Sequence, residues 1–158
     1  KFPDYYIGEQ KALLEVKCFN GVSEKGNKKG PGFDIANFDS YCKSLAENPE
    51  RLFADYLVFS YSLKNSVISI EKVWLKKVWE ITGPSGEFPL KIQVKKGVAY
   101  NIRPVCFDSN RAVYKPFSTY EEFVAALYKT EIQHHQLDKS DNEELFWQNF
   151  DAKFKKND

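Results

Sequence analysis

Hydrophobic and polar positions alternate at the start of the chain and predict a pair of strands. Residues 4–7 form a short aromatic run, residues 8–10 supply a turn, and residues 11–19 alternate with a period of two. Within the alternating run, Glu15 and Lys17 share one face of the strand. The opposite face is apolar and is formed by Leu14, Val16 and Cys18. The pair therefore carries its charged side chains on a strand with an apolar reverse face.

Two further strand pairs are predicted where apolar runs flank short polar turns. The first hairpin spans residues 56–70 around a turn at residues 64–66, and the second spans residues 90–102 around a turn at residues 95–97. The run at residues 72–82 fits a helix and a strand equally well, because its apolar positions satisfy both periods.

Three segments keep the 3.6-residue period of an amphipathic helix. The first runs from residue 35 to residue 45, with Asp34 as its candidate N-cap. The other two follow capping boxes of the form Ser-x-x-Glu at residues 118–121 and 140–143. Strands come first, a helix interrupts them and helices close the chain, which predicts an α+β fold with a mixed sheet.

Composition narrows the class of protein. The 158 residues are 42% hydrophobic, enough for one packed domain, and no apolar run approaches the length of a membrane span. Lys and Arg number 23 against 22 Asp and Glu, so the net charge of +1 excludes a polycation but permits a local basic face. The three cysteines are Cys18, Cys42 and Cys106. Their wide spacing predicts small core residues in a reducing compartment rather than a disulfide or zinc framework.

One spacing carries candidate chemistry. Pro3-Asp4 is followed, after ten residues, by Glu15-Val16-Lys17. An antiparallel partner strand that ends near Asp4 brings its carboxylate to the edge beside Glu15. Two carboxylates and the backbone carbonyl of Val16 form a hard oxygen site suited to Mg²⁺, and Lys17 stands beside it to orient or deprotonate water. The alternative is a solvated strand face with one ordinary Glu-x-Lys pair.

The Pro-Asp…Glu-x-Lys arrangement resembles the PD-(D/E)xK nuclease superfamily, and several collinear stretches resemble the NgoBV/NlaIV group of type II restriction endonucleases. These stretches lie at residues 13–20, 31–38, 55–59, 73–79, 93–98 and 102–104. The resemblance implies an α/β/α-like mixed β-sheet flanked by helices. It also implies that residues 1–158 form a single nuclease domain that lacks its N-terminal region, in keeping with a chain that contains no Met.

The resemblance further implies a function. Asp4 and Glu15 correspond to metal ligands, with the Val16 carbonyl beside them, and Lys17 corresponds to the catalytic lysine. The implied enzyme is a Mg²⁺-dependent type II restriction endonuclease of a prokaryotic restriction-modification system. It would act in the cytoplasm on double-stranded DNA at a split palindrome such as GGNNCC. A palindrome is most simply read by a homodimer.

DNA contacts are expected from a hairpin and a loop. Lys and Arg bind phosphates, while Arg reads guanine and Asn or Gln reads adenine. The predicted hairpin at residues 90–102 and the residue after it offer Gln93, Lys95, Lys96, Asn101 and Arg103. Arg103 is the best candidate for a base contact, and its alternative is a structural salt bridge. Lys28 and Lys29 lie in a Lys-rich loop, and the resemblance adds Asn37.

Other functions remain open from the residues alone. One is another nuclease on the same scaffold, such as a repair or junction-resolving enzyme. A second is a non-catalytic DNA-binding module whose carboxylates are surface charge. A metal-free hydrolase has no support beyond His134-His135, whose adjacent side chains diverge by about 100° on a helix and are best read as an exposed helix end.

Overall fold

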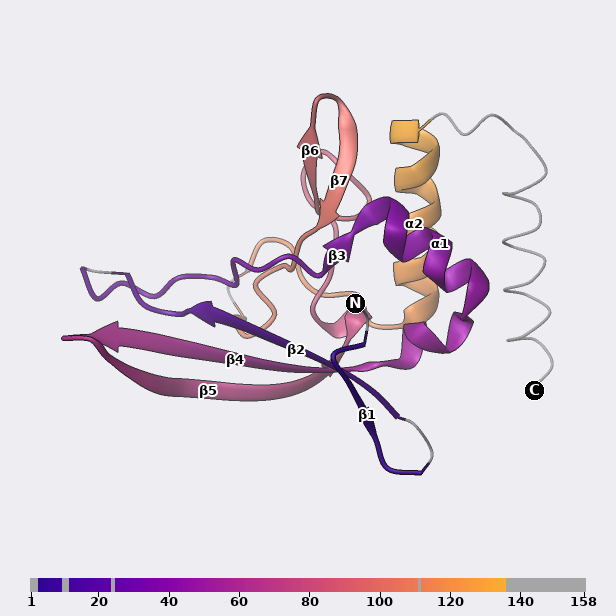
Figure 1. The fold of residues 1–158 in the computed structure, drawn as a ribbon. Coiled ribbons are helices and arrows are strands. Elements are labelled where there is room, and N and C mark those ends of the chain that lie inside the picture. Colours follow the sequence, from indigo (N-terminus) through magenta and orange to yellow (C-terminus); the bar gives the residue numbers. More distant parts are fainter. Residues whose placement is uncertain (1–2, 10–11, 24, 111, 136–158) are drawn as a thin grey trace.

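A computed structural model of the chain describes residues 3–9, 12–23, 25–110 and 112–135. Its larger sheet has four strands in the order β1-β2-β4-β5 (Figure 1). Strands β2 and β4 run parallel, and the other two pairs are antiparallel, so the sheet is mixed as predicted. The strands are β1 (Tyr5–Ile7), β2 (Ala12–Asn20), β4 (Asp55–Lys64) and β5 (Val67–Lys77).

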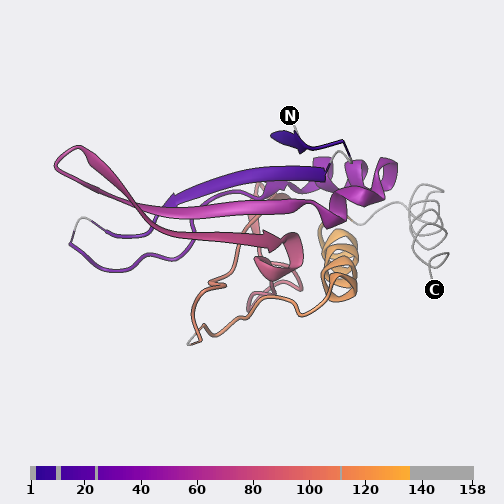
Figure 2. The ribbon, with the colours of Figure 1, turned by 90° about the horizontal axis from the view of Figure 1, so that it is seen from below.

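A smaller antiparallel sheet and two α-helices complete the described fold. The smaller sheet has the order β3-β7-β6, with β3 at Ala36–Asn37, β6 at Ile92–Lys95 and β7 at Val98–Ile102. Helix α1 spans Phe38–Glu47 and helix α2 spans Tyr120–His135. Figure 2 shows α2 and the β6–β7 hairpin on the same side of the larger sheet. Two 3-10 turns, η1 (Pro49–Phe53) and η2 (Val78–Glu80), link these elements to the larger sheet.

Both predicted hairpins form, and their turns have the backbone that a two-residue connection requires. Asn65 and Ser66 have φ values of 51° and 63°, and Lys96 and Gly97 have φ values of 55° and 80°. Positive φ at both central positions matches the right-handed twist of the flanking strands. The ambiguous run at 72–82 is divided, since β5 continues to Lys77 before the chain turns at η2.

The prediction that Asp34 caps the first helix is wrong. The backbone N–H of Ile35 donates to the carbonyl of Ile102 at 3.0 Å, and Ala36 pairs with the same residue, so this segment is extended. Helix α1 therefore begins at Phe38 and Asn37 is its N-cap. The Asn37 side chain accepts a hydrogen bond from the Ser40 N–H at 3.1 Å and donates one to the Tyr100 carbonyl at 2.8 Å.

Replacing Asn37 with Ala is expected to lower the free energy of unfolding by about 1–2 kcal/mol, because one helix cap and one hydrogen bond to β7 are lost. Urea denaturation without DNA measures the effect. Asn27→Ala, in the loop after β2, is the matched control. An Asn37→Ala midpoint equal to that of the control would contradict the capping role.

Helix α2 begins one residue later than predicted. Thr119, rather than Ser118, accepts a hydrogen bond through its hydroxyl, from the Glu122 N–H at 3.4 Å. The Glu122 carboxylate in turn accepts from the N–H of Ser118, the residue before the cap, at 2.8 Å. The predicted box at 140–143 and its helix lie outside the described residues. Among the described helices, none is long and apolar enough to cross a membrane.

The core lies on one face of the larger sheet, and the charged face of β2 points into it. On β4 the side chains of Tyr56 and Val58 are fully buried. Parallel pairing sets Glu15 beside Tyr56, so the charged face of β2 points inward and Glu15 is only 6% exposed. The opposite, apolar face is the more open one: Val73 and Leu75 of β5 are about three-fifths exposed.

The three cysteines are free, as their spacing predicts, but they are not all core residues. Cys18 is exposed, because it lies on the outward face of β2. Cys42 and Cys106 are half-buried. Burial raises the pKa of the Cys42 thiol, so that thiol stays protonated and behaves as a small packing group.

Candidate active site

Strand pairing brings Asp4 and Glu15 to the same edge. Tyr5 of β1 pairs with Leu14 of β2, so the next residue on each strand places Asp4 beside Glu15. The Asp4 carboxylate accepts a hydrogen bond through Oδ2 from the Val16 N–H at 2.9 Å. The contact spans twelve positions in sequence and fixes one oxygen of Asp4, which leaves Oδ1 directed away from that bond.

The backbone of Val16 faces the same edge. In a strand, the N–H and C=O of one residue point toward the same neighbouring strand. The Val16 N–H points to Asp4, and β1 does not extend past Tyr5 in this direction. The Val16 carbonyl is therefore directed toward the edge that β1 leaves open beside Asp4, where it is available to a ligand.

Glu15 and Lys17 form a close ion pair on the inward face of β2. The Lys17 Nζ lies 2.7 Å from Glu15 Oε1. The second oxygen, Oε2, is buried and has no hydrogen-bond partner among the described residues. Leaving a buried carboxylate oxygen without a partner is costly, so this atom is suited to a cation. Glu15 and Lys17 therefore do not lie on a solvated strand face, whereas Asp4 is exposed at the edge of the sheet.

Two further side chains lie near Glu15, and the sequence analysis identified neither of them. Tyr56 is fully buried, and burial raises the pKa of its hydroxyl, with the negative charges of Glu15 and then Asp4 adding to the effect. Arg51, on η1, has its pKa lowered by burial, and the charge of Glu15 opposes that shift. The site is thus two carboxylates beside a neutral Tyr and a partly buried Arg. Only the parallel register of β2 and β4 reveals Tyr56, since no local sequence signal marks it.

The carboxylates do not form a closed protein cage for a metal. Within the described part of the chain, no group of three or more His, Cys, Asp or Glu side chains is placed to hold an ion. A site with two carboxylates and one carbonyl leaves positions for water and phosphate oxygens, which is the coordination that Mg²⁺ favours. His134, expected at an exposed helix end, is instead half-buried with its ring 4.7 Å from that of Phe88.

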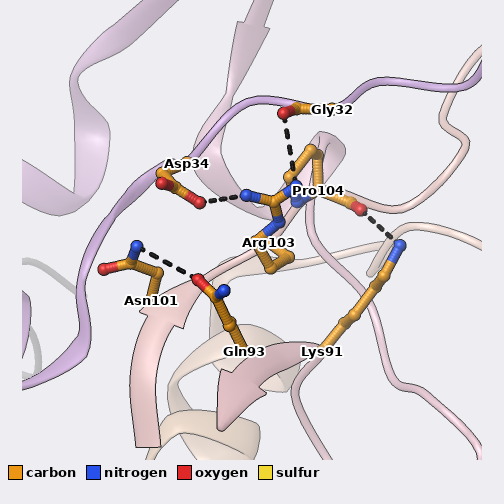
Figure 3. Close-up of polar contacts among 7 residues, drawn as sticks. All are labelled: Gly32, Asp34, Lys91, Gln93, Asn101, Arg103 and Pro104. Carbon is orange, nitrogen blue, oxygen red and sulfur yellow. Dashed lines mark hydrogen bonds and ion pairs between the residues drawn. The ribbon is translucent and has the colours of Figure 1, made fainter. Parts of the chain in front are cut away.

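The predicted DNA-facing hairpin carries an ordered row of polar side chains (Figure 3). The Asn101 amide donates to Gln93 Oε1 at 3.4 Å across the β6–β7 pair. Arg103 forms an ion pair with Asp34 through Nη1 and donates through Nη2 to the Gly32 carbonyl at 3.2 Å. Arg103 thus makes the salt bridge that was its alternative reading, with a side chain that remains 30% exposed.

The remaining DNA candidates are divided between this hairpin and the loop after β2. The Lys95 Nζ lies 4.7 Å from the centre of the Tyr100 ring, and Lys96 occupies the turn. Lys28 and Lys29 are exposed and are tied to the loop by their backbones, Lys28 in a bridge with Val22. In Figure 1 this loop extends along the far end of β2, away from the β6–β7 hairpin.

Comparison with known proteins shows the family to which the chain belongs. The profile of the NgoBV restriction endonuclease family matches residues 1–157. This chain belongs to that family. Type II restriction enzyme NlaIV of Neisseria lactamica is 36% identical over 159 residues, which cover 98% of this chain and 62% of that enzyme. Type II restriction enzyme NgoBV of Neisseria gonorrhoeae is 34% identical over 101 residues, 60% of this chain and 52% of that enzyme.

Solved structures agree with the assignment to the NgoBV family. The NlaIV restriction endonuclease superposes with a TM-score of 0.83 at 35% identity, covering 98% of this chain and 61% of that one. The predicted fold is therefore confirmed as a mixed sheet flanked by helices, consistent with the PD-(D/E)xK-like α+β class. The chain spans about three-fifths of the length of the NlaIV enzyme.

Proposed function

We propose that this chain is the nuclease domain of a type II restriction endonuclease that hydrolyses double-stranded DNA at a short palindromic site. One observation carries the proposal: an inward-facing Glu15 with a buried, unpartnered oxygen lies beside Asp4 and is paired with Lys17. Membership of a restriction endonuclease family supports it. The family resemblance favours a target of the GGNNCC type.

Asp4 and Glu15 would hold Mg²⁺ together with the Val16 carbonyl. The orphaned Oε2 of Glu15 and the hard oxygen chemistry of the set fit that ion. When bound, Mg²⁺ lowers the pKa of water and stabilises negative charge that develops on the phosphate. The buried Tyr56 beside Glu15 shields the carboxylate from bulk water, which strengthens its attraction for a cation.

Lys17 would provide the ammonium group of the site. Its Nζ donates to Glu15 Oε1 at 2.7 Å, which keeps it beside the carboxylates that a scissile phosphate would approach. Lysine offers three rotatable donors on a flexible stem, and it can therefore orient the attacking water or contact a phosphate oxygen without leaving Glu15. Hydrolysis would leave a 5′-phosphate and a 3′-hydroxyl.

The DNA contacts and the assembly follow from the same proposal. Gln93, Asn101 and Arg103 would read bases, while Lys95, Lys96, Lys28 and Lys29 would contact phosphates. Asn37 caps α1 and contributes a hydrogen bond to β7, so any part in the DNA cleft would be through its position rather than a free amide. A palindromic target favours a C2 homodimer, and we expect a restriction endonuclease to act in the prokaryotic cytoplasm.

Digestion of a sequenced plasmid with the purified protein and Mg²⁺ tests the proposed function. We expect discrete fragments whose ends map to one short palindrome, and no cleavage when EDTA replaces Mg²⁺. Branched substrates cut in preference to the plasmid would indicate a junction-resolving nuclease instead. Specific binding without cleavage under any divalent ion would indicate a DNA-binding module, and either result would contradict the proposal.

A further inference from the structure

Arg103 is anchored at both ends of its side chain. Its backbone N–H donates to the Lys91 carbonyl at 3.0 Å, and the preceding residue, Ile102, is buried between β3 and β6 in the smaller sheet. At the other end, the guanidinium is paired with Asp34 and hydrogen-bonded to the Gly32 carbonyl. A long side chain that usually samples many rotamers is thereby fixed in one position.

The contacts with Asp34 and Gly32 leave most N–H groups of the Arg103 guanidinium available for a ligand. Arginine has five N–H groups in a planar fork, and two of them make hydrogen bonds within the described part of the chain, one through Nη1 and one through Nη2. The side chain is 30% exposed, and the Asp34 side chain is 47% exposed. The remaining donors can therefore form a bidentate contact with an acceptor that approaches from solvent.

The surroundings favour a negatively polarised ligand. Lys91 lies near Arg103, and its ammonium donates to the Pro104 carbonyl at 2.9 Å (Figure 3). Burial lowers the pKa of Lys91, and the positive charge of Arg103 lowers it further. Two cations are thus held close together with Asp34 as the one carboxylate paired with Arg103 in this cluster of described residues. The Gln93–Asn101 pair extends the polar row along the same hairpin.

We propose that Asp34 is a specificity-determining positioning residue, which holds the Arg103 guanidinium so that its free edge reads a guanine in the target site. The inference rests on the proposed function. Asp34 acts through Arg103 and does not itself contact DNA. The pairing of guanidinium Nη groups with guanine O6 and N7 is the commonest specific contact of an arginine, and its geometry depends on the orientation of the guanidinium plane.

A purely structural salt bridge accounts for the pair less well. Asp34 and Arg103 lie 69 residues apart, but their strands are already joined by backbone hydrogen bonds between Ile35 and Ile102 and by the β3–β7 pairing. An ion pair as exposed as this one adds little to stability. Its main effect is therefore on where the guanidinium lies.

The test uses the duplex that the wild type cuts and a set of duplexes that each carry one base-pair substitution in its target site. Cleavage of the first is compared with cleavage of each of the others. For Asp34→Asn, the ratio of kcat/KM values between the site and the substituted duplexes should fall about ten- to hundredfold at one or two positions only. Arg103→Lys should lose discrimination at the same positions. The double variant should be no worse than Arg103→Lys alone, because both changes remove one interaction.

Asp108→Asn is the matched control, since Asp108 pairs with Lys72 at 3.3 Å outside the hairpin and the substitution removes the same charge. Its discrimination should equal that of the wild type. The assignment would be overturned if Asp34→Asn discriminated as well as the wild type at every position. It would also be overturned if the variant lost affinity equally for all duplexes and its binding depended less on salt, because that result marks a phosphate contact. Thermal melting of each variant separates these results from a folding defect. If the wild type makes no specific cuts, the proposed function itself fails.

Discussion

Lys17→Ala is expected to lower the rate of DNA cleavage by about 10²–10⁴-fold while leaving site-specific binding largely intact. The expectation follows from its position: the Lys17 ammonium is held 2.7 Å from Glu15 Oε1, on the inward face of β2 and beside the two carboxylates. Alanine removes the cation that orients water or contacts the phosphate. It does not touch the β6–β7 hairpin, where the proposed base contacts lie.

Single-turnover cleavage of a duplex carrying the target site measures the effect, and gel-shift titration with Mg²⁺ omitted measures binding. Lys43→Ala is the control, because Lys43 is exposed on α1 and its loss changes the net charge equally. Cleavage by Lys17→Ala at the rate of the control would show that the catalytic assignment is wrong. Loss of binding in parallel with cleavage would instead place Lys17 in DNA recognition.

Glu15→Gln is expected to abolish binding of Mg²⁺ at the site and to slow cleavage by about 10³-fold, which corresponds to several kcal/mol of transition-state stabilisation. Glutamine keeps the shape of the side chain but removes the charge that the buried, unpartnered Oε2 would offer to a cation. The same change also removes the charge that pairs with Lys17 at 2.7 Å, so the melting temperature of the variant without metal is its own baseline.

Metal binding can be followed without cleavage. Ligands that bind only the folded state raise its stability with concentration, so the melting temperature of the wild type should rise with Mg²⁺ and that of Glu15→Gln should not. Glu71→Gln is the control, since Glu71 lies on β5, away from the site, and its carboxylate accepts a hydrogen bond from the Ser62 hydroxyl at 2.5 Å. An equal rise in melting temperature for Glu15→Gln would exclude Glu15 as a ligand.

The sequence located the candidate carboxylates because their signal is local. Asp4 and Glu15 are joined by one tight strand connection, so the alternation of the second strand and the position of the turn were enough to bring them together. Lys17 could be placed on the same face as Glu15 from the two-residue period of the strand alone. Tyr56 was missed because it lies beside Glu15 only through the parallel pairing of β2 with β4, which are far apart in the chain. Arg51 was missed because it lies on η1, the turn that leads into β4.

The cap of α1 shows how a correct local rule is overridden. Asp34 is a favourable capping residue, and the apolar spacing from Ile35 fits a helix. Residues 35–37 nevertheless pair with strand β7 through backbone hydrogen bonds, so the helix starts at Phe38. Asn37, a second favourable capping residue, is its N-cap. Asp34 is left to pair with Arg103, a partner that no pattern within either segment predicts.

The sequence by itself determined the hairpins, the starts of the two described helices to within three residues, the class of fold and the Asp-Glu-Lys constellation, because turns, caps and short-range alternation are decided by neighbours in the chain. The tertiary structure alone decided which face of β2 is buried, which side chains surround Glu15 and which carboxylate holds Arg103. Those outcomes depend on the register between distant strands. A shift of one residue in that register would exchange the faces of β2 without altering any local preference.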